Sequence, residues 1–589
     1  MRRRTRNWLV ILIAVAGIGL TASGVFSGAS AIGSEDPALT TQDSRALQRK
    51  VQEYNRLMGS VLYQVGSAYY QDVEIADVAM AGIKGMMAGL DPYSDFYIEE
   101  IDPGMVADME ITTTGTYSGI GATIGYSGGV LSIIAPMKGE PAQRVGLLAG
   151  DVIAMIDGEP SKTFDTAKAA SLIKGPVGTD VTLMIEREGF PEPLEFVITR
   201  AQIEVNDVSA ATFAAPGVAY IEIGRFSKNT GRFMVEAIEK LGREQPIEGL
   251  ILDLRGNPGG LLDEAIAVTE PLVAPGEMIV YINGRIPSMN QNFFSREQQL
   301  YDGRLVVMVN QASASASEII AGAVQDLDRG IVVGRTSFGK GLVQQVGQMG
   351  QVPDGIGNNF IRLTTGEYFT ASGRNLQRPF GTDDLGRTVI TFPGDADSTE
   401  RPVYLSQKGR AVTGGGGVVP DIDVEGITGN ILLFDLKFRR GLFLRYVNNY
   451  VNTRNIAEGT TVEVDDTLLA DFRTWANEQG FTFETPTEMR LSGLVETAEA
   501  EGVDDAMASE ITALQRAIER QKDAMWQESR DKIALELRRE FVTRLQGYDA
   551  GLMEYFGEDP QFQAALRVLS NQERYASILS GEQVGGGGL

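Results

Sequence analysis

The chain has 589 residues, of which 43% are hydrophobic and 22% charged, so it is long enough for several hydrophobic cores. It contains no histidine and no cysteine, which excludes Ser-His-Asp and Cys-His catalytic sites and zinc sites with His or Cys ligands. A formal net charge of −26 disfavours nucleic-acid binding, because affinity for phosphate needs a basic surface, and we therefore expect no nucleic-acid partner.

The first 31 residues have the pattern of a secretory signal. Arginines crowd the first six positions, an apolar stretch runs from Trp8 to Leu20, and small residues continue to Ala31. If the apolar stretch is extended through Phe26, the segment also fits an uncleaved membrane anchor with its positive flank inside. Both alternatives predict that the rest of the chain is exported to the periplasm or another extracytoplasmic compartment.

A helical segment and a β-rich segment follow. After a polar linker that ends at Asp43, apolar residues recur every four positions between 57 and 69 and predict helix within residues 44–89. The LDPYS sequence at 90–94 ends this segment with a turn. From 117 to 200, short β-like runs alternate with glycine-rich turns.

Residues 217–424 mix strands and helices. We expect buried strands at 249–254 and 304–309, each followed by a turn and a helix. Such units build an α/β core that carries functional sites at its strand-to-helix turns. The tail from residue 427 is expected to be mainly helical, with one apolar face formed by Ile511, Leu514, Ile518 and Met525.

The SASASE sequence at 313–318 lies at the second of these turns. Ser315 and Glu318 fit a capping box, and helix capping alone explains most such serines. The same geometry places a serine hydroxyl beside the free N–H groups at a helix N-terminus, which can hold a developing oxyanion. The residues themselves leave both interpretations open.

A serine nucleophile needs a base, and without histidine the candidate is a lysine that burial keeps neutral. An ordinary lysine has a pKa of ~10.4, and burial can lower it by ~3–5 units. Lys340, in the FGKG sequence at 338–341, is such a candidate, and Gln344 shares its face in either a strand or a helix. The alternatives are a lysine on an exposed turn and a solvated glutamine.

The RGNPGG sequence at 255–260 is a second unusual turn. It follows a predicted buried strand, and its glycines permit positive φ and a close approach of other backbone. Gly259 or Gly260 can therefore supply another N–H group to an oxyanion, although a plain tight turn explains the glycines equally well.

Together these segments resemble the carboxyl-terminal processing proteases, also called tail-specific proteases, from about Leu57 to Val424. The family has a SASAS sequence and an FGKG sequence, and the Lys of FGKG lies 25 residues after the middle Ser of SASAS. It also has a Gln four residues after that Lys and a DLRxNxGG turn. All four features are present in this chain. The resemblance implies that Ser315 is the nucleophile, Lys340 the general base and Gln344 its partner. It also implies an oxyanion hole built from the N–H groups of Gly260 and Ala316, with no metal and no other cofactor.

The resemblance further implies the architecture. An α/β protease core of the crotonase or ClpP-like type is expected from residues 204–425 together with 90–109, with an inserted β-rich PDZ domain at 110–203. Helical N-terminal and C-terminal regions are expected at 44–100 and 426–589. The implied partners are protein or peptide substrates with free C-termini and an adaptor protein, whereas the amphipathic terminal helices indicate association with further copies of the chain.

In the PDZ domain, Gly119, Ile120 and Gly121 occupy the place of the loop that holds a terminal carboxylate. Consecutive backbone N–H groups can cradle such an anion, and the peptide would add as a strand at the domain's edge. The chain departs from the family's usual pattern at two positions: Tyr93 stands where many members have His, and Lys174 stands where many have Arg.

Two other functions compete with an exported serine endopeptidase that acts through an acyl-enzyme. The GRTSFGKG sequence at 334–341 is nearly a nucleotide-binding P-loop, but Gly341 replaces the hydroxyl residue that would hold Mg²⁺. The second alternative is a non-catalytic PDZ scaffold that only captures peptides. The joint presence of Ser315, Lys340 and Gln344 favours the endopeptidase over both.

Overall fold

The computed structural model describes residues 41–98, 102–127, 129–351, 358–383, 388–391, 401–427 and 429–581. The proposed signal or anchor at 1–31 and the terminal glycine run lie outside these ranges. The described residues form two compact units, one from residues up to Gly115, Val205–Gly426 and residues from Gln561, the other from Thr116–Glu204 and Ile427–Pro560. The fold is mixed α/β with a β-rich segment and helical segments at both ends, as predicted.

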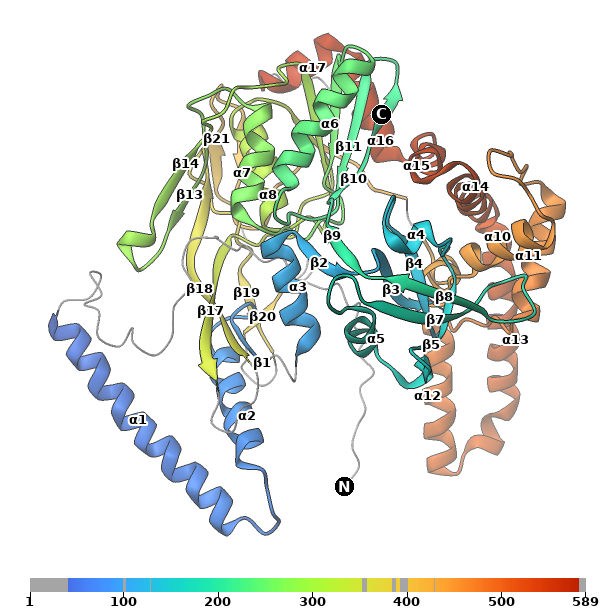
Figure 1. Ribbon diagram of the computed structural model, residues 1–589, viewed down its shortest axis with the longest axis horizontal. Coiled ribbons are helices and arrows are strands. Elements are labelled where there is room, and N and C mark those ends of the chain that lie inside the picture. The colour runs from blue at the N-terminus through green and yellow to red at the C-terminus, as the bar shows by residue number, and fades with distance from the viewer. Residues whose placement is uncertain are drawn as a thin grey trace. The chain divides into compact units, whose positions relative to one another are not determined.

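Two helices open the first unit, α1 (Thr41–Ala68) and α2 (Ile75–Ala88), drawn in blue in Figure 1. Helix α1 begins three residues inside the segment that we expected to be linker. Its apolar side chains are largely exposed, whereas the α2 residue Met87 is buried against strand β1 (Asp95–Ile98). Among the described helices, none combines the length and the apolar composition needed to cross a membrane.

A six-stranded sheet lies at the centre of the first unit. Its order is β10-β11-β12-β15-β16-β23, and all neighbours from β11 onward run parallel. Both expected buried strands are present as β12 (Gly249–Asp253) and β15 (Arg304–Val309). Every residue of β12 is buried, which is typical of parallel strands covered on both faces. The other strands are β10 (Val208–Ala215), β11 (Val218–Ile223), β16 (Ile331–Gly334) and β23 (Ile422–Asp423).

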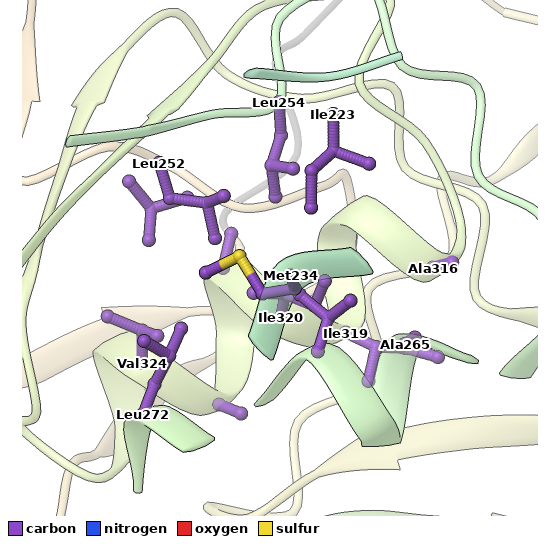
Figure 2. Packing of buried hydrophobic residues seen from close by; sticks show 14 of the residues in the cluster. Ile223, Met234, Leu252, Leu254, Ala265, Leu272, Ala316, Ile319, Ile320 and Val324 are labelled. Carbon is purple, nitrogen blue, oxygen red and sulfur yellow. The ribbon is translucent and has the colours of Figure 1, made fainter. Parts of the chain in front are cut away.

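Three helices cover this sheet, α6 (Thr230–Glu244), α7 (Leu262–Thr269) and α8 (Ala316–Asp326), and they lie side by side in Figure 1. Figure 2 shows the core between them, where Met234 of α6 and Ile320 of α8 meet Leu252 of the sheet. Since all eleven residues of α8 are buried, the turn that precedes it is held in a fixed position.

A second, antiparallel sheet in the same unit has the order β1-β18-β13-β14, and β17 also pairs with β18. Its long strand β18 (Asn358–Thr370) pairs with β17 (Leu342–Gln351) and with β1. Asp95 of β1 lies opposite Arg362 of β18, so a segment that precedes the β-rich insertion in sequence belongs to a sheet of the first unit. The remaining strands of this unit are β13 (Met278–Asn283), β14 (Gln291–Phe294), β19 (Phe380–Thr382), β20 (Thr388–Ile390), β21 (Val403–Leu405) and β22 (Ala411–Thr413).

The β-rich half of the second unit is a small sheet with the order β3-β4-β5-β7-β8. Strand β7 (Asp180–Glu186) alternates buried and less buried residues, as a strand with one core face should. The edge strand β3 (Ala122–Ser127) contacts helix α5 (Thr166–Ile173). The rest of this half comprises β2 (Thr116–Gly119), β4 (Val130–Pro136), α4 (Pro141–Arg144), β5 (Val152–Ile156), β6 (Glu159–Pro160), β8 (Leu194–Thr199) and β9 (Ala201–Glu204).

The helical half of the second unit packs around aromatic side chains. Tyr446 of α10 (Leu442–Thr453) contacts Phe472 of α11 (Asp466–Glu478) and Phe541 of α14 (Arg530–Gln546). Helices α12 (Pro486–Glu501) and α13 (Asp504–Glu528) contact each other. The remaining described helical elements are α9 (Ile431–Phe434), a π-helical turn at Asp435–Arg439 and α15 (Tyr548–Phe556).

One expectation for this helical half is wrong in part. Ile511 and Ile518 of α13 are buried and Met525 packs on the apolar cluster, but Leu514 is 48% exposed. Three positions separate Leu514 from Ile511, and this offset carries its side chain past the edge of the narrow buried stripe.

The last two helices belong to the first unit. In α16 (Pro560–Ser570), Phe562 packs on Tyr220 of strand β11, and the Gln561 amide donates to the Val424 carbonyl. In α17 (Gln572–Leu579), the Tyr575 hydroxyl accepts from the Leu305 N–H of strand β15. The region from residue 426 to the end is therefore divided between the two compact units.

Candidate active site

Ser315 occupies the turn between β15 and α8, directly before the first residue of the helix. Its φ of 54° is rare for a residue with a side chain, and its side chain is 2% exposed. Because Ala316 is the first residue of α8, its N–H group has no carbonyl partner inside the helix. A hydroxyl and a helix N-terminus thus meet at one strained turn, the arrangement that a nucleophile with an oxyanion site requires.

Glu318 joins this turn to the loop that carries Lys340. One carboxylate oxygen accepts from the Ser315 N–H at 2.8 Å and from the Lys340 N–H at 2.8 Å. The other accepts from the Ser337 hydroxyl at 2.5 Å and from the Gly339 N–H at 2.7 Å. The side chain is fully buried, and desolvation raises its pKa to about 7. The expected capping role of Glu318 is present, and the same carboxylate also fixes the second loop.

The RGNPGG turn packs directly against Ser315. A Cβ added to Gly259 would lie 2.8 Å from the Ser315 Cβ and 3.0 Å from the Ala316 nitrogen, so only glycine allows this approach. Gly260 and Phe226 form an isolated parallel β-bridge. Its two hydrogen bonds are made by the residues on either side of Gly260: the Phe226 N–H donates to the Gly259 carbonyl, and the Leu261 N–H donates to the Phe226 carbonyl. In a strand-like bridge successive N–H groups alternate in direction, so the Gly260 N–H points away from Phe226.

Lys340 is buried, with 2% of its surface exposed, and not a lysine on an exposed turn. Its amine lies 4.8 Å from the centre of the Tyr93 ring. Burial lowers its pKa from 10.5 to about 7, and the charge of Arg362 acts in the same direction, while Glu318 and Asp91 oppose it. A substantial fraction of this amine is therefore neutral near pH 7 and able to accept a proton.

Two shared partners hold the backbones of Ser315 and Lys340 together. Glu318 accepts from both N–H groups, and the Tyr368 hydroxyl contacts both carbonyl oxygens, at 3.3 Å in the case of Ser315. Tyr368 is itself buried in strand β18. The two residues that the sequence singles out, 25 positions apart, thus belong to one rigid cluster.

Gln344 is fully buried in strand β17, which contradicts a solvated side chain at this position. Its amide nitrogen donates to the Thr364 hydroxyl of strand β18 at 3.2 Å. Among the described residues, nothing donates a hydrogen bond to its buried carbonyl oxygen. Such an acceptor is costly to leave unused, so this atom is available to a group that enters or moves within the site.

The LDPYS turn contributes residues to the site, although its sequence predicts only the end of a helical segment. The Asp91 carboxylate accepts from the N–H groups of Tyr93 and Ser94 at 2.8 and 2.9 Å, and from the Thr364 hydroxyl at 3.2 Å. The Tyr93 ring is buried among Ala314, Phe338 and Leu342, which flank the nucleophile and the lysine. It therefore shields the Lys340 amine from water.

The functional residues that sequence reasoning missed are Asp91, Tyr93 and Thr364, and Glu318 was recognised only as a cap. Their roles depend on the pairing of β1 with β18, which joins residues about 270 positions apart. The one sequence signal for these residues was LDPYS itself, which predicts an Asx-type turn. The residues next to it in the sequence do not predict which part of the fold this turn contacts.

The nucleotide-binding alternative is wrong. A P-loop leads from a strand into a helix, and its lysine must reach a phosphate. Here residues 334–341 lead from β16 into strand β17, and the Lys340 side chain is buried under Tyr93.

Gly119, Ile120 and Gly121 lie at the turn from β2 to β3, in the second unit. Ile120 is buried, and Gly121 has a φ of 72° and lies so close to Glu140 that a Cβ would approach its side chain to 2.3 Å. The Lys174 amine lies 5.7 Å from the centre of the Tyr117 ring, next to this turn. The turn therefore combines a tight glycine backbone with a nearby cation.

Comparison with known proteins gives three family matches. The model of peptidase family S41 matches residues 217–385, that of the PDZ domain matches 132–187, and one described as a probable PDZ-protease C-terminal helical domain matches 434–569.

Individual relatives agree with these matches. A carboxy-terminal-processing protease of Bartonella bacilliformis is 32% identical over 380 residues, which cover 64% of this chain and 82% of the relative. A carboxyl-terminal-processing protease of Synechocystis sp. is 37% identical over 301 residues, covering 50% of this chain and 68% of the relative. Among solved structures, a photosystem II D1 C-terminal processing protease is 25% identical and covers 62% of this chain and 85% of its own, with a TM-score of 0.33.

Proposed function

Since this chain belongs to peptidase family S41 and is a serine peptidase of the C-terminal processing type, we propose that Ser315 is its nucleophile and Lys340 its general base. Gln344 orients the lysine, and the N–H groups of Ala316 and Gly260 form the oxyanion hole. The observation that carries this proposal is the burial of the Lys340 amine, whose pKa of about 7 makes it a base at neutral pH.

Acylation begins when the neutral Lys340 amine takes the hydroxyl proton of Ser315 and the Ser315 oxygen attacks the scissile carbonyl carbon. The negative charge on the carbonyl oxygen is held by the two backbone N–H groups. The Lys340 ammonium then gives its proton to the leaving amine as the C–N bond breaks, which leaves an ester on Ser315.

Deacylation repeats these steps with water. The Lys340 amine takes a proton from water as the water oxygen attacks the ester carbon. When the ester C–O bond breaks, the proton returns to Ser315 and the new carboxyl terminus is released. Because the lysine starts each half-reaction as a neutral amine, the rate should rise as the pH increases through its pKa.

Cleavage of a disordered polypeptide with an apolar C-terminal residue tests these assignments. We expect Ser315→Ala and Lys340→Ala to abolish cleavage, whereas Ser209→Ala and Lys240→Ala, at exposed positions on the same unit, should cleave like the wild type. Equal cleavage by all five proteins would refute the site assignment.

We also propose that the PDZ domain selects substrates by their C-termini. Its edge strand β3 pairs only with β4 in the sheet and faces α5, so an added peptide strand can pair with its free edge. The glycine turn at 119–121 and Lys174 supply N–H donors and positive charge for the terminal carboxylate. A peptide with a free C-terminus should bind more tightly than the same peptide amidated, and equal affinities would argue against this role.

Export and self-association are further parts of the proposal. The charged, apolar and small-residue order of residues 1–31 supports export, with cleavage or anchoring to be decided from the mass of the mature chain. On α1, Leu47, Val51, Tyr54, Met58 and Val61 follow the alternating spacing of four and three residues that is typical of coiled coils, and all are at least 39% exposed. This stripe supports association with a second copy of the chain, whereas the adaptor protein rests on the resemblance alone.

A further inference from the structure

Three polar side chains, of which Gln344 is fully buried and Asp91 and Thr364 partly buried, form a row that leads from the LDPYS turn toward Lys340. The Asp91 carboxylate contacts the Thr364 hydroxyl at 3.2 Å, and the same hydroxyl contacts the Gln344 amide nitrogen at 3.2 Å. The three residues come from separate parts of the chain, the turn before β1, strand β18 and strand β17. Nothing in the chemistry of acyl transfer described above assigns a task to Asp91 or Thr364.

The direction of the hydrogen bonds in this row follows from the donors available. A carboxylate can only accept, so the single hydroxyl proton of Thr364 is directed at Asp91. Toward Gln344 the hydroxyl then has only lone pairs to offer, and it accepts from the amide nitrogen. The amide carbonyl oxygen of Gln344 is thereby turned to the opposite side, where it is buried and lacks a donor among the described residues.

Resting on the proposed role of Lys340 as general base, we infer that Asp91 and Thr364 are positioning residues that fix the orientation of the Gln344 amide, so that its oxygen faces the Lys340 amine. Gln344 follows Lys340 by four residues, and Asp91 is close enough to act on the charge of Lys340. In the working site that we infer, this oxygen, which has no donor in the described part of the chain, accepts one N–H of the amine and leaves the nitrogen lone pair for the Ser315 proton. The reversed amide would donate its own N–H to that lone pair and block the base.

The orientation has a second consequence, for the protonated state. An ammonium group is a stronger hydrogen-bond donor than an amine, so a carbonyl oxygen in this position stabilises the ammonium form of Lys340 more than the neutral form. Removing the constraint on Gln344 should therefore lower the pKa of the lysine. A loss of catalytic positioning and a shift of the pH profile to lower pH are expected together.

The test compares Thr364→Val, which keeps the shape of the side chain but removes the hydroxyl, with Thr364→Ser, which keeps the hydroxyl. We expect Thr364→Val to lower kcat at least about tenfold with little change in KM, because a misaligned base acts on the transition state. We also expect the midpoint of its acidic limb to move to lower pH. Thr364→Ser should retain the wild-type kcat and midpoint, as should the matched control Thr365→Val on the neighbouring residue of β18.

The outcomes separate this inference from the proposed function. A Thr364→Val enzyme with wild-type kcat and midpoint, measured beside an inactive Lys340→Ala, would overturn the positioning role and leave the base in place. An active Lys340→Ala would refute the base itself. A lower kcat with an unmoved midpoint, or a Thr364→Ser enzyme as impaired as Thr364→Val, would show that Thr364 only packs. If Thr364→Val fails to fold, the same comparison on Asp91→Asn decides, with a fall in kcat and an acid shift as the supporting result.

Discussion

At the scale of single residues, Glu318 ties the two loops of the site together, because its buried carboxylate accepts four hydrogen bonds from them. Replacing it by Gln keeps the shape but turns one oxygen into an NH₂ group, which then faces two N–H or O–H donors. Each donor left without an acceptor costs about 1–3 kcal/mol in a buried site. We therefore expect Glu318→Gln to lower both the melting temperature and the cleavage rate.

Glu488 provides the matched control, since it also closes a capping box, at the N-terminus of α12 in the other compact unit. Glu488→Gln should leave the cleavage rate unchanged. A Glu318→Gln enzyme with the wild-type rate and melting temperature would show that the carboxylate does not hold the two loops in register.

The sequence was sufficient to single out Ser315 and Lys340 as candidates, because each lies in a distinctive loop that follows a largely apolar strand, β15 or β16. It was not sufficient for Asp91, Tyr93 and Thr364. Their position depends on the antiparallel register of β1 and β18. These strands are far apart in the sequence, so no local sequence pattern predicts their pairing. The exposure of Leu514 likewise depends on the width of the buried face of α13, and the spacing of apolar residues in the sequence does not determine that width.

At the scale of elements, helix α10 attaches the helical half of the second unit to its β-rich half. The Asn448 amide donates to the Ala149 carbonyl at 2.6 Å, and the Asn452 amide donates to the Glu188 carbonyl at 2.8 Å. Arg445 forms an ion pair with Glu188 at 2.8 Å. These three residues lie on one side of α10, opposite the apolar residues that face the helical core, so the helix is bound on both sides.

This attachment can be tested with a disulfide, because the native chain has no cysteine. A Cβ added to Gly189, whose φ is 86°, would lie 3.0 Å from the Cβ of Asn452, so a small outward shift of this loop brings the pair into the ~3.5–4.5 Å separation of disulfide Cβ atoms. We expect Gly189→Cys/Asn452→Cys to form an intramolecular disulfide under mild oxidation, detected by mass spectrometry. Gly178→Cys/Asn452→Cys serves as control, since a Cβ on Gly178 meets nothing within 4 Å. Reduced thiols in the first variant, or equal yields in both, would contradict the packing.

At the scale of the whole molecule, the buried amine of Lys340 makes the free energy of unfolding depend on pH. Its folded pKa of about 7 lies below the ordinary 10.5 of the unfolded chain. Between these values the unfolded chain binds a proton that the folded chain does not, so this contribution to stability rises with pH, by up to about 1.4 kcal/mol per unit. Below pH 7 Lys340 is protonated in both the folded and the unfolded chain, so the full cost of burying its charge lowers the free energy of unfolding.

Lys340→Met removes this dependence while keeping a long side chain. The stability of the variant relative to the wild type should therefore be greatest below pH 7 and should decrease as the pH approaches 10.5, as measured by urea unfolding at several pH values. Lys240→Met, at an exposed position of α6, should differ from the wild type by a constant amount. A constant difference for Lys340→Met as well would show that the amine is protonated and solvated in the folded protein.

The protonation of Lys340 itself is the most direct measurement. In protein labelled with ¹³C-lysine, the Cε resonance that disappears in Lys340→Ala can be followed as the pH is raised. A midpoint near 7 is the predicted result, because desolvation beneath the Tyr93 ring disfavours the charged amine. A midpoint near 10.5 would mean that the site contains no neutral base at physiological pH, and the mechanism proposed for this peptidase would be wrong.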